Sequence, residues 1–86
     1  MIPAAQKALI DKRIRGTPRE VYFWLHERLE TAIYRPTTLG RIVIGTGMHR
    51  ATVHVAVKRL LEVGYIDRRF GDSRMPLYRL VNALDE

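Results

Sequence analysis

Apolar residues recur at helical spacing in the stretch after Gly16. Val21, Leu25 and Leu29 share one face, and charged residues occupy the other faces. This spacing is typical of an amphipathic helix, and Pro36 forbids its continuation. We predict one helix over residues 18–34. The helix also carries three consecutive aromatics, which we assign to the core rather than to a platform for stacking bases: Tyr22, Phe23 and Trp24.

The start of this helix has its own local signals. Thr17 is a suitable N-cap, Pro18 suits the first turn, and Glu20 completes a capping box with Thr17. Residues 1–16 have only partial helical spacing, which leaves a short helix or a basic arm as alternatives.

Two further helices are predicted. Residues 39–45 are β-branched enough to resemble a buried strand, but Thr37 or Thr38 can cap a helix there and Gly45 or Gly47 can end it. We therefore expect a short helix. The next segment, residues 49–63, has a regular apolar face and stops at a glycine, as a helix should. That face consists of Val53, Ala56, Val57 and Leu60.

The C-terminal third predicts a β-hairpin. Two β-prone runs, residues 65–70 and 74–81, flank the turn residues 71–73. Pro76 cannot donate a backbone hydrogen bond, so its strand is expected at an edge or paired over only part of its length. The expected fold class is α+β, mainly α, with residues 17–81 as one domain, residues 1–16 preceding it and residues 82–86 as a short acidic tail.

Charge adds a functional direction to this pattern. The chain of 86 residues has a net charge of +6, a surplus that favours a polyanionic partner in so small a domain. Residues 1–16 have a net charge of +3 and residues 49–81 a net charge of +4, whereas residues 17–48 contribute only +1. Not every basic residue in the second cluster points to a ligand, because Arg59 and Arg79 are as well placed to pair with Glu62 or other acids.

The join between the second and third helices narrows the fold. Residues 46–49 contain Gly47 and have the length of the turn in a helix-turn-helix, which lets two helices cross and presents the second one outward. The run from Leu39 to Ile66 resembles the winged helix-turn-helix of bacterial repressors such as the GntR and MarR families. This sequence departs from the pattern at Val43, where a small alanine is usual, and at His49, where a small hydroxylated cap is usual.

The resemblance implies a function in binding double-stranded DNA as a small transcriptional regulator, with residues 49–63 in the major groove and residues 65–81 on the backbone or in the minor groove. Arg50 is then expected to contact a guanine, and Lys58 a phosphate. The hairpin arginines are expected to position the protein on the backbone. The complete set of expected DNA-binding residues is Thr38, His49, Arg50, Ala51, Thr52, His54, Lys58, Arg68, Arg69 and Arg74.

Other classes of function find little support. The chain has no cysteine, and its three histidines have neither thiolate partners nor the spacing of a metal site, so we expect no metal and no other cofactor. No carboxylate pair, nucleophile triad or phosphate loop is present, so we expect no enzymatic activity. A membrane span and a secretory signal are also missing, which predicts a cytoplasmic protein. No small-molecule effector domain is expected after the hairpin.

Two alternative functions remain open for this fold, and the sequence also bears on its oligomeric state. The same fold serves as a protein-protein interaction module, for which Val55, Leu61 and Val63 would form the apolar patch, or as the DNA-binding part of a phage or plasmid replication or recombination factor. Because a single recognition helix reads few base pairs, we also expect a homodimer. Its self-complementary surface would come from the N-terminal segment, with the residues Ala4, Ala5, Ala8, Leu9 and Ile14.

Overall fold

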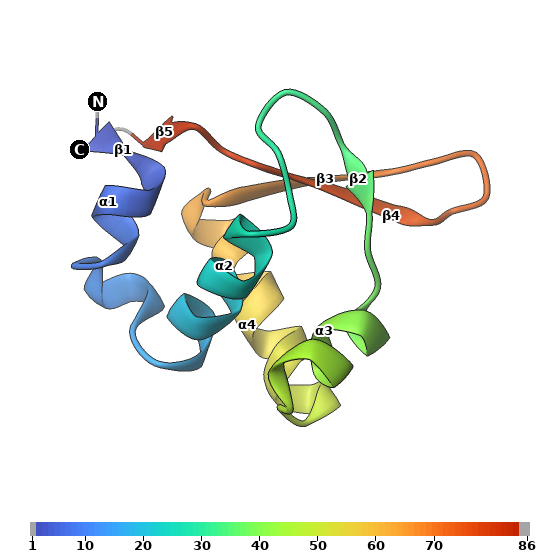
Figure 1. Ribbon diagram of the computed structural model, residues 1–86, viewed down its shortest axis with the longest axis horizontal. Helices are drawn as coiled ribbons and strands as arrows, with labels where there is room; N and C mark the ends of the chain where they lie inside the picture. The colour runs from blue at the N-terminus through green and yellow to red at the C-terminus, as the bar shows by residue number, and fades with distance from the viewer. Residues whose placement is uncertain (1, 85–86) are drawn as a thin grey trace.

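The computed structural model describes residues 2–84 and has an α+β fold (Figure 1). Helices lie on one side of a small antiparallel sheet, whose hairpin extends away from them. The elements in chain order are β1 (Ile2–Pro3), α1 (Ala4–Ala8), the 3₁₀ helix η1 (Lys12–Ile14), α2 (Thr17–His26), β2 (Arg35–Pro36), α3 (Leu39–Thr46), α4 (Arg50–Val63), β3 (Ile66–Phe70), β4 (Pro76–Leu80) and β5 (Ala83–Leu84).

Helix α2 is shorter than its apolar pattern predicts, because it ends at His26 rather than near residue 34. The carbonyl of Leu25 accepts the N–H groups of both Arg28 and Leu29, which closes the last turn. The chain then returns to the sheet, where Arg35 and Pro36 pair with β4. Pairing with β4 therefore overrides the helical spacing of residues 30–34.

The start of α2 also differs from the prediction. Gly16 is the N-cap, with φ at 86°, and no side chain caps the helix. Thr17 is already the first helical residue, so the predicted capping box between Thr17 and Glu20 does not form. A backbone with positive φ favours glycine, and at Gly16 this geometry sets the entry into the helix.

Helices α3 and α4 form as predicted and are joined by a tight turn. The side chain of Thr38 accepts the N–H of Arg41 at 3.2 Å and so caps α3. Gly47 ends that helix in the left-handed conformation, at φ 75°, and Gly64 ends α4 in the same way. The strand-like propensity of residues 39–45 thus yields to capping signals and to packing, since Ile42 is fully buried against the core.

The predicted hairpin forms from β3 and β4, with Ile66 opposite Leu80 and Phe70 opposite Pro76. Strand β4 lies in the centre of the three-stranded sheet, between β2 and β3. Pro76 is the first residue of β4, and β2 pairs only with Leu77 and Tyr78 beyond it. Of the two alternatives for this proline, partial pairing is the one that occurs, because its missing N–H lies outside the β2 ladder.

The N-terminal segment packs onto the helical core instead of extending from it. Strand β1 pairs with β5, and α1 is the short helix that was one of the two alternatives. Ala4, Ala8 and Ile14 are almost completely buried within the chain. The prediction that these five residues form a dimer surface is therefore wrong, because three of them already pack inside the monomer. Of the larger side chains in the predicted surface, only that of Leu9 is exposed.

A buried polar network fixes this segment to the end of α4. Asp11 accepts hydrogen bonds from the side chain of Arg13, from the N–H of Arg13 and, at 2.8 Å, from the hydroxyl of buried Tyr65. The hydrogen bonds from Arg13 hold the pKa of Asp11 well below its ordinary value, against the opposing effect of burial. Burial, with the adjacent carboxylate, raises the pKa of Tyr65 above its ordinary value.

Candidate nucleic-acid interface

Helix α4 has one anchored face and one open face. Val53, Ala56, Val57 and Leu60 are buried, as predicted, and hold the helix against the core. On the outer side, most of the expected DNA-binding side chains of this helix are exposed, and Thr52 is half-buried at the edge of that surface. The exposed members are His49, Arg50, Ala51, His54 and Lys58.

The open N-terminal end of α4 lies against the start of α3. His49 is the N-cap residue but makes no side-chain hydrogen bond to the helix, so it does not replace the small hydroxylated cap that is usual at this position. A Cβ placed on Gly40 would have the Thr38 hydroxyl at 3.7 Å and an Nη1 atom of Arg50 at 4.0 Å. Thr38 and Arg50 are twelve positions apart in the sequence, and both lie next to Gly40 of α3.

A groove runs between α4 and the hairpin. It has a volume of about 310 Å³, and His54 and Lys58 from α4 face Arg68 from β3 across it. Its other lining residues are mostly apolar, with Tyr78 and Leu39 among them. Two elements that lie far apart in sequence thus bring three basic side chains to one concave surface, which suits a negatively charged strand with a phosphate backbone.

The three hairpin arginines do not act as one group. Successive side chains on a strand point to opposite faces, so Arg68 shares the face of buried Ile66 whereas Arg69 lies on the other face. The Arg69 guanidinium lies 5.0 Å from the ring centre of Tyr34, away from the groove. Arg74 is in the turn at the end of the hairpin, with φ at 60°. Of the three hairpin arginines, only Arg68 therefore lines the groove.

Two other arginines have acidic partners, which is one of the two alternatives that the sequence leaves open for them. Arg59 pairs with Glu62 at 3.7 Å and donates to the carbonyl of Arg13 at 2.8 Å. Arg79 pairs with Asp67 at 3.1 Å. Both residues therefore already have protein partners, and we do not include them in the candidate interface.

Sequence reasoning missed the apolar part of the groove. Leu39, Leu61 and Tyr78 line it, but each also fits a plain core pattern. The signal that could have identified Tyr78 is the hairpin register, which places it directly opposite Arg68. That register follows from turn geometry and is not readable from spacing alone.

Within residues 2–84, no three His, Cys, Asp or Glu side chains gather in a way that could hold a metal ion. The same part of the chain contains no helix with the length and hydrophobicity needed to cross a membrane. The chain matches no protein-family model, and no curated protein sequence or solved structure gives a significant match to it.

Proposed function

We propose that this protein is a winged helix-turn-helix regulator that binds double-stranded DNA in a sequence-specific manner. The observation that carries the proposal is the basic groove between α4 and the hairpin, which joins His54, Lys58 and Arg68. Support also comes from the order of elements, in which α3, a tight turn at Gly47 and α4 are followed directly by a β-hairpin. The excess of positive charge on the chain is consistent with such a partner.

In this proposal the exposed first turns of α4 enter the major groove. Arg50 reads a guanine through its two guanidinium donors, while Ala51 and His54 lie next to neighbouring bases. Lys58 and Arg68, which lie on opposite sides of the protein groove between α4 and the hairpin, contact phosphates and so fix the register of the protein on the duplex. The proposed role is binding, and no residue is assigned to catalysis.

A protein-interaction module is the weaker candidate. Its expected apolar patch would need Val55, Leu61 and Val63 on one open surface. Val55 is 63% exposed, but Leu61 and Val63 pack against the core as partly buried residues. Two of the three anchors are therefore committed to folding, which leaves little for a partner to bury.

We also propose that two copies act on one operator. A module of this size buries roughly 600–1,000 Å² on DNA, which gives limited specificity among many competing sites. Because Ala4, Ala8 and Ile14 are buried in the monomer, the contact between copies must come from another surface or from the DNA itself. Mass measurement of the free protein and of its DNA complex gives the stoichiometry; one copy per selected site would contradict this part of the proposal.

The test of DNA binding is selection of bound duplexes from a random library, followed by affinity measurements on a selected and a scrambled duplex. Arg50→Ala is expected to weaken the selected duplex by about 1–3 kcal/mol and to relax the preference at one base pair. Arg15→Ala is the matched control, because Arg15 is exposed but lies outside the proposed interface. Failure to enrich any sequence would refute specific binding, and an Arg50→Ala variant with unchanged preference would remove Arg50 as a reader.

A further inference from the structure

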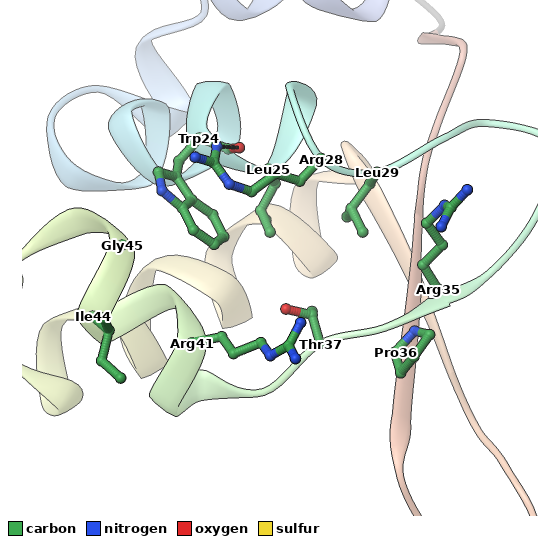
Figure 2. A pocket seen from close by; sticks show the side chains of 10 residues that line it. All are labelled: Trp24, Leu25, Arg28, Leu29, Arg35, Pro36, Thr37, Arg41, Ile44 and Gly45. Atoms are coloured by element: carbon green, nitrogen blue, oxygen red, sulfur yellow. Dashed lines mark hydrogen bonds between the residues drawn. The ribbon is translucent and has the colours of Figure 1, made fainter.

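A second cavity lies on the other side of α3, between that helix and the end of α2. Its volume is about 530 Å³, and it is open to solvent on one side. Figure 2 shows Trp24, Leu25 and Leu29 projecting into it from α2 and the turn after it, while Arg41 and Thr37 extend along the opposite wall. None of these residues belongs to the proposed DNA interface.

The wall formed by α2 is apolar and preformed. Leu25 and Leu29 are buried, and the Trp24 ring packs so closely on α3 that a Cβ at Gly45 would overlap it, with the indole Nε1 at 2.6 Å. The Arg28 guanidinium lies 4.0 Å from the centre of the same ring and fixes it from outside. The accessible apolar surface of this wall is therefore mainly the half-buried Trp24 ring, with the two buried leucines behind it, and a small hydrated inorganic ion would not cover that ring.

The charge of the pocket is concentrated on one residue. Arg28 pairs with Glu27, and Arg35 pairs with Glu30, so each of these two charges is compensated. Among residues 2–84, Arg41 has no acidic partner. Its guanidinium therefore supplies one uncompensated positive charge at the rim of an apolar cavity.

From this arrangement we infer that the pocket binds a small organic anion, with one negatively charged group on Arg41 and a planar apolar body against the Trp24 ring. The volume lies within the range of about 300–1,000 Å³ that holds such ligands. A charge-assisted hydrogen bond to guanidinium would orient the anionic group, and the Thr37 hydroxyl lies on the same wall to support it. The site lies within the domain itself, and the inference does not depend on DNA binding.

The single tryptophan makes the pocket observable in the 86-residue chain. In a ¹⁵N-labelled sample, the Trp24 indole N–H and the Gly45 amide report on the pocket, and the Gly71 amide reports on the distant hairpin turn. The probes are 1-naphthoate, 1-naphthyl phosphate and the neutral 1-naphthylmethanol. We expect one or both anions to shift the Trp24 and Gly45 signals in a saturable manner, to leave Gly71 unchanged, and to bind more tightly than the alcohol.

Arg41→Gln is expected to weaken binding of the anionic probe about tenfold and to leave the alcohol unaffected, because only the charge-assisted contact is lost. Arg15→Gln is the control, since it removes the same charge from an exposed site elsewhere. Which anion binds better identifies the head group as carboxylate or phosphate. The inference is overturned if neither anion shifts the two signals, if the alcohol binds equally well, or if both variants weaken binding alike. It is also overturned if an acidic amphipathic peptide binds there more tightly than either anion, because the surface would then be a protein docking face.

Discussion

The two adjacent arginines of β3 allow a sharp test of the proposed DNA interface. Arg68 and Arg69 are both exposed and carry the same charge, but only Arg68 lines the groove with His54 and Lys58. Arg69 lies beside Tyr34 on the opposite face of the hairpin. Replacing either one by glutamine changes the net charge equally, so any difference between the two variants measures position and not total charge.

The expected magnitude follows from counterion release. Loss of one phosphate contact reduces the slope of log affinity against log salt by about 0.9. When salt rises fourfold, from 50 to 200 mM, a variant that lacks one phosphate contact should therefore lose roughly 3.5-fold less affinity than the parent. We therefore expect Arg68→Gln to bind every duplex more weakly than the parent at low salt, with the difference narrowing as salt rises. Arg69→Gln is expected to keep the slope of the parent.

Fluorescence anisotropy of a labelled duplex over a series of salt concentrations measures both slopes. Sequence preference is expected to survive in both variants, because the affected contact is to the backbone. Equal slopes for Arg68→Gln and Arg69→Gln would refute the argument, since the groove would then have no special role. A loss restricted to the selected duplex would instead mean that Arg68 reads a base.

Three further predictions concern stability. Asp11→Asn is expected to lower the free energy of unfolding at pH 7 by about 1.5–3 kcal/mol, because it weakens charge-assisted hydrogen bonds. Folding depresses the pKa of Asp11, so the stabilisation from its carboxylate is present above the unfolded-state pKa of about 3.9 and is lost as pH falls toward the folded-state value. Urea denaturation at pH 7 and pH 3 should therefore show a smaller loss of stability in acid for the variant than for the parent. Tyr65→Phe, measured in the same way, is expected to cost about 0.5–1.5 kcal/mol, and no loss at pH 7 would contradict the role of its hydroxyl. Gly47→Ala and Gly45→Ala should separate backbone strain from steric overlap. Gly47→Ala is expected to lower the free energy of unfolding by about 1–2 kcal/mol, because the residue has a positive φ although an added Cβ meets no neighbour. Gly45→Ala is expected to displace Trp24 and alter its fluorescence, a change that Gly47→Ala should not produce.

Local patterns in the sequence were sufficient for the elements whose signals are local. The apolar face of residues 50–63 and the glycine at position 64 determine α4, because side chains three and four positions apart share a face whatever the rest of the chain does. Thr38 and Gly47 likewise set the ends of α3, since capping and the left-handed conformation act within one turn. The turn residues between β3 and β4 predicted the hairpin for the same reason.

The tertiary structure alone decided the features that depend on pairing across long sequence separations. Helix α2 stops at His26 because the chain beyond it pairs with β4, a strand that begins fifty residues later in the sequence at Pro76. Ala4 and Ala8 of the N-terminal segment are buried because they fit between α2 and β5, and the spacing of the segment alone gave no sign of that packing. The groove at Arg68 and the pocket at Arg41 arise in the same way: residues from separate elements meet only when the packing of those elements is fixed, and no local pattern contains that information.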